Sequence, residues 1–361
     1  MKILHVITSL YTGGAEKLMV DLLPRMKAQG HQVELCVFDG THTPFFEQLE
    51  KAGIKIHWFH KGGSVYNPLN MWRLCCLMCK GWDIVHAHNT APQLFAAFGG
   101  VLCSVVLVTT EHTTSNRRRD WKWYAWLDRW MFRQYKEVIC ISSQAEVNHR
   151  KHVGDGESGN VCTIFNGIDY HKYAGATPAV DVRTLGNKII TNVAGFRYQK
   201  DQPTLIKAMK HLPDDYHLCL VGDGERRPEY EALVKELDLE QRIHLLGLRS
   251  DVPEILAASD YVVMCSHFEG LSLSSLEGMA SGKPFLADNV DGLREIVEGN
   301  GVLFEHEDVQ GFANAILKLD SDLAYRERIA KQCQAKAIQY DISVMTEKYL
   351  GVYKKLVDNE V

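Results

Sequence analysis

Residues 3–38 read ILHVITSLYTGGAEKLMVDLLPRMKAQGHQVELCVF, and the order of patterns in this stretch decides the fold class. The apolar run Ile3–Ile7 predicts a buried strand, and Gly13–Gly14 predicts a turn after it. The amphipathic pattern Ala15–Gln29 predicts a helix, and the apolar run Gln32–Phe38 predicts a second strand. A strand, a glycine loop, a helix and a further strand form the repeating unit of doubly wound α/β proteins.

Short apolar runs and helical patterns continue to alternate through both halves of the chain. The predicted strands of the first half are Asp83–His86, Val105–Thr109, Glu137–Ile141 and Val161–Phe165, and those of the second half are Lys188–Ala194, Leu218–Val221, Ile243–Leu246, Tyr261–Cys265 and Pro284–Ala287. We therefore predict an α/β fold of two Rossmann-like domains that face each other across a ligand cleft at the carboxyl ends of their strands. The predicted boundaries are 1–170 for the N-terminal domain, 171–187 for a linker and 188–340 for the second domain.

The composition excludes several classes of protein. Of the 361 residues, 46% are hydrophobic and 24% are charged, which is typical of globular proteins and not of disordered or collagen-like chains. The longest apolar stretch, Leu94–Val108, contains two glycines and is shorter than the about 20 residues of a membrane-spanning helix. Because Gly13 and Gly14 follow the first apolar run so closely, we do not expect a signal peptide.

Charge is distributed unevenly along the chain. Residues 1–187 hold 20 Lys and Arg against 16 Asp and Glu, a net charge of +4, and the remainder holds 20 against 29, a net charge of −9. A cationic N-terminal half suggests an anionic partner on that side. Nucleic acid is not expected as a partner, because the sequence pI of about 6.3 lies below the basic range of nucleic-acid binders and no recognition motif is present.

The cysteines and histidines do not form a metal-binding pattern. Ten cysteines are scattered, mostly within apolar runs, and there is no Asn-X-Ser/Thr acceptor site, so we expect buried thiols in a reducing cytoplasm. The pair Cys76-x-x-Cys79 has no second pair and lies within the apolar run Cys75–Cys79. The histidines form neither His-x3-His nor His-Glu-x-x-His. No metal site is therefore predicted.

The segments His267–Ser272 (HFEGLS) and Glu277–Pro284 (EGMASGKP) are the most informative part of the second half. They come after a predicted strand and form a glycine-containing loop followed by the start of a helix. In such a loop, backbone N–H groups and the helix N-terminus can bind an anion. Glu269 and Glu277 can both face the cleft, where carboxylates suit hydroxyl groups rather than phosphate. The structural alternatives are a solvated loop charge for Glu269 and a capping box, Ser274-x-x-Glu277, for the second glutamate.

This block resembles the signature of the retaining nucleotide-sugar glycosyltransferases of family four, which have the GT-B fold. The pair Glu269-x7-Glu277 is its most specific part. Other motifs match the family in order and spacing, namely Gly13–Gly14–Ala15–Glu16, His86–Ala87–His88, Asn166–Gly167–Ile168–Asp169, Gln199–Lys200–Asp201 and Val221–Gly222–Asp223–Gly224. The resemblance covers nearly the whole chain, and it implies that a closing helix within 341–361 returns to the N-terminal domain.

The resemblance implies a role for each matching residue. Glu277 would hold the ribose hydroxyls of the donor, Glu269 would hold hydroxyls of the transferred sugar, and Lys200 would neutralise the diphosphate. The backbone of the loop that follows Glu269 would meet the sugar and the distal phosphate through Gly270, Leu271 and Ser272. Gly13 and Gly14 would let the first loop approach the same phosphates without intervening side chains.

Two further residues have a competing structural interpretation. His88 matches the family position that touches the donor sugar and assists the reaction, and a hydrogen-bonded histidine at a strand end is the alternative. Relatives usually carry an arginine at the position of Gly195, five residues before Lys200. Here Arg197 is the nearest arginine, and we assign it to the diphosphate with a solvated loop arginine as the alternative.

Residues 117–136 hold four of the seven tryptophans, next to basic residues. On a helix, one stripe would contain Trp123, Trp126 and Trp130 and the neighbouring stripe would contain Arg118, Lys122, Arg129 and Arg133. This pair of stripes favours an interfacial helix on anionic lipid, and a core-facing stripe with a solvated basic edge is the alternative. His112 ends the preceding strand and resembles the acceptor-side loop of the family.

The resemblance, together with the charge distribution and the tryptophan stripe, implies a hexosyl- or N-acetylhexosaminyltransferase, cytoplasmic and peripheral on the inner face of the cell membrane. It would move a sugar from a nucleoside-diphosphate sugar to a hydroxyl group of a lipid-linked saccharide, with retention, in cell-surface polysaccharide or glycolipid assembly. The resemblance implies no cofactor and no divalent metal. The commonest donor nucleotide in the family is UDP rather than GDP. The alternatives are a sugar-nucleotide epimerase of the same architecture and a non-catalytic nucleotide-sugar-binding protein.

Overall fold

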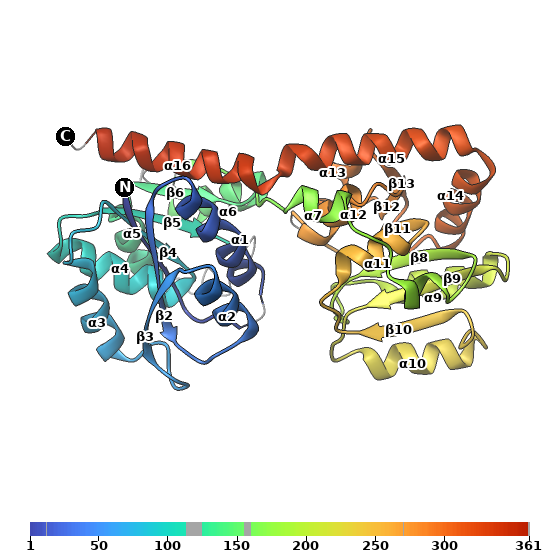
Figure 1. The fold of residues 1–361 in the computed structure, drawn as a ribbon, viewed down its shortest axis with the longest axis horizontal. Helices are drawn as coiled ribbons and strands as arrows, with labels where there is room; N and C mark the ends of the chain where they lie inside the picture. Colours follow the sequence, from blue (N-terminus) through green and yellow to red (C-terminus); the bar gives the residue numbers. More distant parts are fainter. Residues whose placement is uncertain (12, 113–124, 155–159, 270, 360–361) are drawn as a thin grey trace. The chain divides into compact units, whose positions relative to one another are not determined.

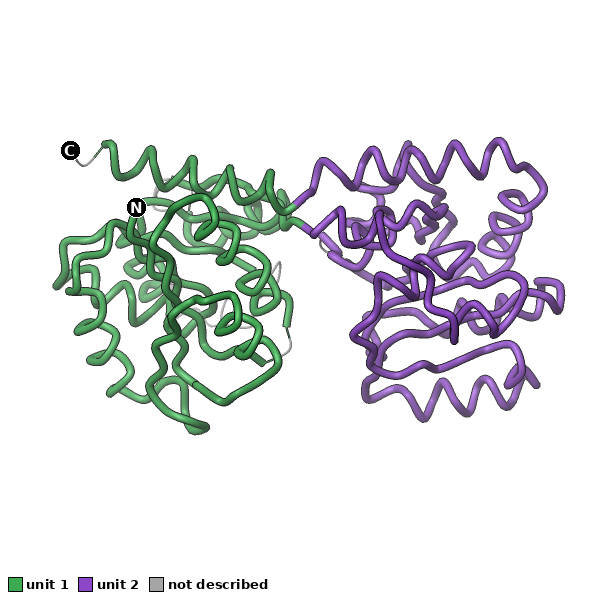
Figure 2. Tube along the Cα trace, in the orientation of Figure 1, with its two compact units in different colours: residues 1–167, 342–361 green, residues 168–341 purple. Residues whose placement is uncertain are grey.

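The computed structural model describes residues 1–359 except 12, 113–124, 155–159 and 270. The chain forms two compact units, which are coloured separately in Figure 2. Unit 1 contains Met1–Gly167 together with Ile342–Val361, and unit 2 contains Ile168–Asp341. Each unit is an α/β domain with its own parallel sheet, so the predicted fold class of two Rossmann-like domains is confirmed.

Unit 1 is built on a seven-stranded parallel sheet (Figure 1). Its elements are β1 (Lys2–Ile7), α1 (Gly14–Ala28), β2 (Gln32–Asp39), α2 (Pro44–Lys51), β3 (Lys55–His60), α3 (Pro68–Met78), β4 (Ile84–His88), α4 (Thr90–Leu102), β5 (Val106–Glu111), α5 (Ala125–Arg133), β6 (Glu137–Cys140), α6 (Ser143–Val153), β7 (Val161–Thr163) and α16 (Ile342–Asp358). The strand order is β3-β2-β1-β4-β5-β6-β7. Helices cover both faces, as a parallel sheet requires.

Two apolar cores fill the space between this sheet and its helices. On one face, Leu22 of α1 and Tyr349 of α16 pack against Ile3 and Val108 of the sheet. On the other face, Leu74 of α3 and its neighbours from α4 and α5 pack against a second set of strand residues. The closing helix α16 therefore belongs to the core of unit 1.

Unit 2 repeats the architecture on a six-stranded parallel sheet of order β10-β9-β8-β11-β12-β13. Its strands are β8 (Lys188–Val193), β9 (Tyr216–Val221), β10 (Ile243–Gly247), β11 (Tyr261–Met264), β12 (Phe285–Asp288) and β13 (Val302–Phe304). Its helices are α7 (Tyr170–Ala174), α8 (Val180–Arg183), α9 (Gln202–Ala208), η2 (Met209–His211), α10 (Arg227–Glu236), α11 (Val252–Ala258), α12 (Leu273–Ala280), α13 (Arg294–Val297), α14 (Val309–Ser321), α15 (Leu323–Ala337) and η3 (Ile338–Tyr340). One large core joins this sheet to its helices.

The structure differs from the sequence-based expectation in residues 171–187. We predicted a linker there, but these residues lie within unit 2 and include α8 and most of α7. Val182 of α8 is fully buried against Ile189 and Cys219. A short helix with one buried residue leaves no periodic pattern in the sequence. The prediction therefore rested on the Gly, Pro and Thr content of the segment, which is typical of a linker.

The expectation of buried thiols is confirmed for Cys36, Cys140, Cys219, Cys265 and Cys333 but is wrong for Cys76, Cys79 and Cys103. Cys79 and Cys103 form a disulfide that joins the carboxyl ends of α3 and α4, and Cys76 is exposed. The two helices pack so closely that a Cβ on Gly99 would lie 2.5 Å from a side chain of α3. The cysteines are 24 residues apart in sequence, and only the packing of two helix ends brings them together.

Candidate functional site

The loop between β11 and α12 carries the glutamate motif of unit 2. Helix α12 begins with Ser272 as its N-cap, and the Ser272 hydroxyl accepts a hydrogen bond from the Ser275 backbone N–H at 3.3 Å. Glu277 therefore lies in the second turn and not at the third position of a capping box, which excludes that alternative. Its side chain is buried and Leu271 packs against the core of unit 2, whereas Gly270 lies outside the described residues.

Two loops at the carboxyl end of the unit 2 sheet are joined by backbone hydrogen bonds. Lys200, in the loop after β8, forms an isolated antiparallel bridge with Ser266, in the loop after β11. Next to it, the His267 N–H donates to the Gln199 carbonyl at 2.9 Å. This is the edge of a parallel α/β sheet at which ligands usually bind.

Lys200 and Glu269 meet at this junction. The Lys200 ammonium and the Glu269 carboxylate form an ion pair, and their side chains are 15% and 12% exposed. The Ser266 hydroxyl donates a second hydrogen bond to Glu269 at 3.3 Å. The structure thus brings together the residue assigned to the diphosphate and the residue assigned to the sugar. Arg197 is exposed, and its backbone carbonyl accepts a hydrogen bond from the Lys200 backbone N–H at 2.9 Å.

Sequence reasoning missed a polar network behind this loop. The Asp288 carboxylate is fully buried, accepts hydrogen bonds from the Ser266 N–H at 3.0 and 3.2 Å, and contacts His306 at 3.0 Å. His306 in turn contacts His267 at 3.2 Å. Burial is the largest influence on Asp288 and raises the pKa of its carboxyl. Asp201, His267 and His306 place nitrogen and oxygen atoms within 4.8 Å of one another, a spacing that a metal ion could bridge.

The predicted residues of unit 1 lie around the ends of β1 and β4. Gly13 is the N-cap of α1, and a Cβ there would lie 2.2 Å from the Glu16 carboxylate, so a larger residue would displace the Glu16 side chain. A Cβ on Gly14 would have no other atom within 4 Å. Asn89, directly after β4, has a positive φ of 68° and donates a hydrogen bond to Glu16 at 3.4 Å.

His88 lies at the end of β4 within a group of four histidines. Its two ring nitrogens contact His5 at 3.0 Å and His112 at 2.9 Å. His5 and His86 are paired in neighbouring strands, so His5, His86 and His88 share one face of the sheet. The His88 side chain is fully buried, while His112 is half-buried and forms the outer end of this chain of contacts. The atoms of His5, His86 and His88 also lie within 4.8 Å of one another, a second possible metal group.

Helix α16 completes this histidine group. The Tyr353 hydroxyl contacts one ring nitrogen of His86, and Thr110 of β5 contacts the other at 2.8 Å. Thr110 also contacts the Tyr349 hydroxyl at 3.3 Å. One buried polar atom in the group, Nε2 of His5, has no hydrogen-bond partner.

The described part of the predicted tryptophan stripe is divided between the surface and the core. Arg118, Lys122 and Trp123 lie outside the described residues. Trp126 of α5 is 67% exposed, whereas Trp130 is half-buried and packs on Phe98 of α4 with ring centroids 4.6 Å apart. Met131 is fully buried, while Arg129 and Arg133 are exposed. The core interpretation therefore holds for Trp130 and Met131, whereas Trp126 lies at the surface and its contact with lipid stays a prediction.

Comparison with known proteins identifies the family. Residues 12–172 match the family model for glycosyltransferase family 4, and residues 179–336 match the model for glycosyl transferases group 1. The chain belongs to the family 4 glycosyltransferases. This enzyme is thus a transferase, and not the epimerase or the non-catalytic binding protein considered as alternatives.

Two relatives of this glycosyltransferase have names that state an activity. An *Escherichia coli* protein named UDP-Gal:alpha-D-GlcNAc-diphosphoundecaprenol alpha-1,3-galactosyltransferase is 29% identical over the whole chain and 98% of its own length. The N,N'-diacetylbacillosaminyl-diphospho-undecaprenol alpha-1,3-N-acetylgalactosaminyltransferase of *Campylobacter jejuni* is 27% identical over 47% of this chain and 46% of its own. HepE of *Anabaena*, solved with UDP, shares the fold with a TM-score of 0.85, at 24% identity over 98% of this chain and all of its own.

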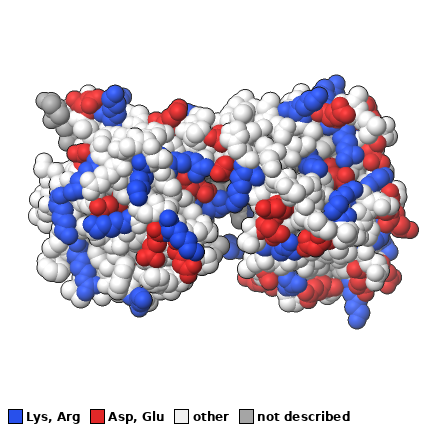
Figure 3. Space-filling model, viewed as in Figure 1, with Lys and Arg blue, Asp and Glu red and all other residues white. Residues whose placement is uncertain are grey.

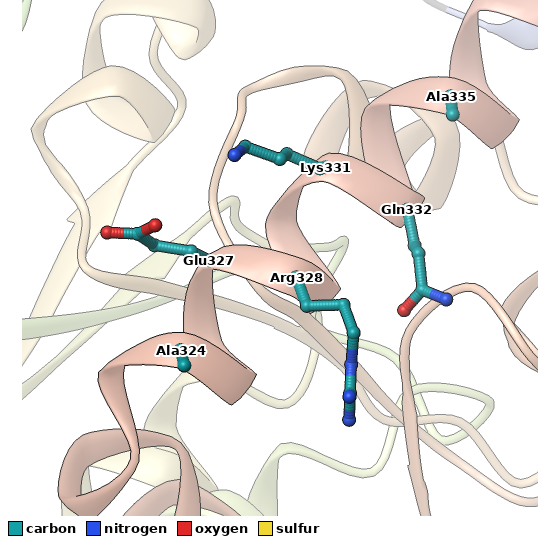
Figure 4. A pocket seen from close by; sticks show the side chains of 6 residues that line it. All are labelled: Ala324, Glu327, Arg328, Lys331, Gln332 and Ala335. Carbon is teal, nitrogen blue, oxygen red and sulfur yellow. The ribbon is translucent and has the colours of Figure 1, made fainter.

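An open hollow of about 540 Å³ lies beside α15 in this glycosyltransferase (Figure 4). It is lined by residues of that one helix, which are Ala324, Glu327, Arg328, Lys331, Gln332 and Ala335. Glu327 and Lys331 point to one side and Arg328 and Gln332 to the other. Because the polar groups do not converge, we do not assign a site there.

The histidine group gives the glycosyltransferase a predicted pH dependence of stability. Burial lowers the pKa of His5 to about 3 and of His112 to about 4, and it lowers the pKa values of His86 and His88 well below 6.5. Between these values and pH 6.5 the unfolded chain binds more protons than the folded chain, so stability is lost as the pH falls. Each histidine that the folded chain keeps neutral lowers the free energy of unfolding by up to about 1.4 kcal/mol for every pH unit below 6.5.

We therefore expect the free energy of unfolding of unit 1 to fall by a few kcal/mol between about pH 7.5 and pH 5.5. Urea titrations followed by circular dichroism at several pH values measure it. His5→Asn should flatten this slope, while a variant of the exposed His211, His211→Gln, should not change it. Equal slopes for the parent and His5→Asn would show that the group does not control acid stability.

Proposed function

We propose that this glycosyltransferase moves a hexosyl or N-acetylhexosaminyl group from a UDP-sugar to a hydroxyl group of a lipid-linked saccharide, with retention of the anomeric configuration. It would act in the assembly of cell-surface polysaccharide or glycolipid, in the cytoplasm and at the inner face of the cell membrane. The observation that carries the proposal is the Lys200–Glu269 ion pair, together with the buried Glu277 in the helix that follows the same loop. A cation and two carboxylates at the carboxyl edge of one sheet match the diphosphate and the hydroxyls of a nucleotide sugar.

The proposed reaction exchanges one bond at the anomeric carbon. The acceptor hydroxyl oxygen bonds to that carbon, the bond from the carbon to the diphosphate breaks, and the hydroxyl proton leaves with the released nucleoside diphosphate. Lys200 and the N-terminus of α12 would stabilise the negative charge that grows on the diphosphate. Glu269 would exchange its pairing with Lys200 for sugar hydroxyls, and Glu277 would accept hydrogen bonds from the ribose.

The relatives support the choice of donor and acceptor. HepE was solved in complexes with UDP and with UDP-glucose, which supports a uridine nucleotide. The names of the *E. coli* and *C. jejuni* relatives contain a diphosphate-linked undecaprenol acceptor. Among the described residues, no helix is long and apolar enough to cross a membrane.

A panel of nucleotide sugars, each incubated with and without undecaprenyl-diphosphate saccharides, tests this proposal. We expect sugar transfer from a UDP-sugar only when the acceptor is present, and an axial anomeric linkage by NMR when the donor is an α-linked sugar. A product of inverted configuration would contradict retention. Transfer to water-soluble saccharides at equal efficiency would contradict the lipid-linked acceptor.

A further inference from the structure

Helices α3 and α4 of unit 1 expose several large apolar side chains. Leu69 and Trp72 lie three residues apart on α3 and are 56% and 65% exposed. Phe98, Val101 and Leu102 lie on α4 and are 38%, 61% and 75% exposed. A single exposed leucine is ordinary on a protein surface, whereas several large apolar groups in one place indicate an interaction surface.

The two helices that carry these side chains are packed against each other. A Cβ on Gly99 of α4 would lie 2.5 Å from a side chain of α3, and the disulfide Cys79–Cys103 joins the ends of the two helices. On its other side, α4 contacts α5 through the pair Phe98–Trp130. Three neighbouring helices, α3, α4 and α5, therefore each expose large apolar side chains, that of α5 being Trp126.

The charges at this surface are positive. Helix α3 contains Arg73 and no acidic residue, Lys80 follows it, and α4 has no charged residue. In the described part of α5, Asp128 is buried and paired with a histidine of α6, whereas Arg129 and Arg133 are exposed. Figure 3 shows Lys and Arg side chains along the edge of unit 1 on which α3 lies. The described parts of these three helices thus expose cations and apolar groups without a carboxylate.

We propose that the α3–α4 face, defined by Leu69, Trp72, Phe98, Val101 and Leu102, rests on an anionic membrane surface. Tryptophan prefers the boundary between lipid and water, and Lys and Arg near that boundary are attracted to anionic headgroups. This inference rests on the proposed function, since a lipid-linked acceptor requires the enzyme at a membrane, and it specifies the surface that makes the contact.

A second copy of the chain fits this face less well. In a symmetric dimer the same patch of both copies meets, so Arg73 and Lys80 of one copy would approach the same cations of the other. Neither α3 nor α4 offers a carboxylate to compensate them. An anionic lipid surface supplies the missing negative charge and also accepts the apolar side chains.

Co-sedimentation with phosphatidylcholine vesicles, with and without phosphatidylglycerol and at low and high salt, tests the inference. We expect the parent enzyme to bind the anionic vesicles and to be released by salt. The double variant Trp72→Ser/Phe98→Ser should bind at least about tenfold more weakly. Each aromatic side chain that moves from water into lipid raises the affinity for the vesicles by more than about tenfold. The matched control is Val180→Ser/Leu248→Ser, which alters residues of unit 2 that are 77% and 82% exposed, and it should bind as the parent does.

A second measurement places Trp72 directly at the lipid. Lipids with brominated acyl chains should quench the tryptophan fluorescence of the parent, and Trp72→Phe should show less quenching while still binding vesicles. UDP titration should give the same affinity for every variant, and urea titrations followed by circular dichroism should show that unit 1 of each variant is folded.

Three results would overturn the inference. These are equal sedimentation of the parent and Trp72→Ser/Phe98→Ser, binding that ignores lipid charge, and a dimer that this variant converts to a monomer without changing vesicle binding. Its failure can be told apart from failure of the proposed function. A parent that transfers sugar without binding vesicles would contradict only the membrane face, whereas a parent that binds vesicles and transfers no sugar would contradict only the proposed reaction.

Discussion

Lys200→Ala is expected to lower kcat of sugar transfer about 100-fold to 1,000-fold without unfolding the enzyme. The reason is that Lys200 is the cation at the junction of the two donor-side loops, next to Glu269 and close to the start of α12. Removing a charge that stabilises the leaving group costs several kcal/mol of transition-state stabilisation. Initial rates with a UDP-sugar and a lipid-linked acceptor measure the effect. Lys207→Ala, on the exposed side of α9, is the matched control.

A double variant separates two causes of that loss. Lys200→Ala removes the ammonium group next to Glu269, and the negative charge of this nearly buried carboxylate could then itself repel the diphosphate. If the missing positive charge is the cause, Lys200→Ala/Glu269→Gln should remain as inactive as Lys200→Ala. Recovery of activity in the double variant would assign the loss to the carboxylate instead.

The proposed role of Lys200 also implies that activity does not depend on a divalent metal. We expect the rate to be unchanged by EDTA, because protein groups would supply the positive charge at the diphosphate. Complete loss of activity with EDTA, restored by Mg²⁺ or Mn²⁺, would contradict this assignment. The side chains of Asp201, His267 and His306 would then be the first candidates for the metal ligands in unit 2.

The sequence predicted the central strands better than the edge strands. Runs such as Ile3–Ile7 and Tyr261–Cys265 are buried on both sides of a parallel sheet and are therefore continuously apolar. The edge strand β3, KIHWFH, mixes charged and apolar residues because it is only half-buried, and the edge strand β13 has three residues. Neither leaves a strong pattern, and we predicted neither.

The candidate site was predictable as a set of motifs but not as a set of contacts. The glutamate motif and Lys200 could be assigned from resemblance, whereas their ion pair depends on the packing of two loops 69 residues apart. His5 and His88 become neighbours only because β1 and β4 are adjacent in the strand order. Asp288 has no motif, and its place is set by the end of β12.

Glu277→Ala is expected to raise the dissociation constant of UDP by an order of magnitude or more. The proposed contact consists of two hydrogen bonds from ribose hydroxyls to a buried carboxylate in the second turn of α12. Charge-assisted hydrogen bonds of this kind contribute roughly 1.5–3 kcal/mol each. Glu277→Gln keeps one acceptor oxygen without the charge, so its affinity should lie between those of the parent and Glu277→Ala.

Calorimetric titration with UDP measures this effect, and Glu298→Ala, which alters an exposed glutamate of unit 2, is the matched control. The loss should appear with UDP alone, because the ribose belongs to the nucleotide and not to the sugar. Glu269→Gln should weaken the binding of the UDP-sugar more than that of UDP, because Glu269 is assigned to the sugar hydroxyls. Unchanged UDP affinity in folded Glu277→Ala would instead assign this glutamate to the packing of α12, and the ribose would then need another partner in unit 2.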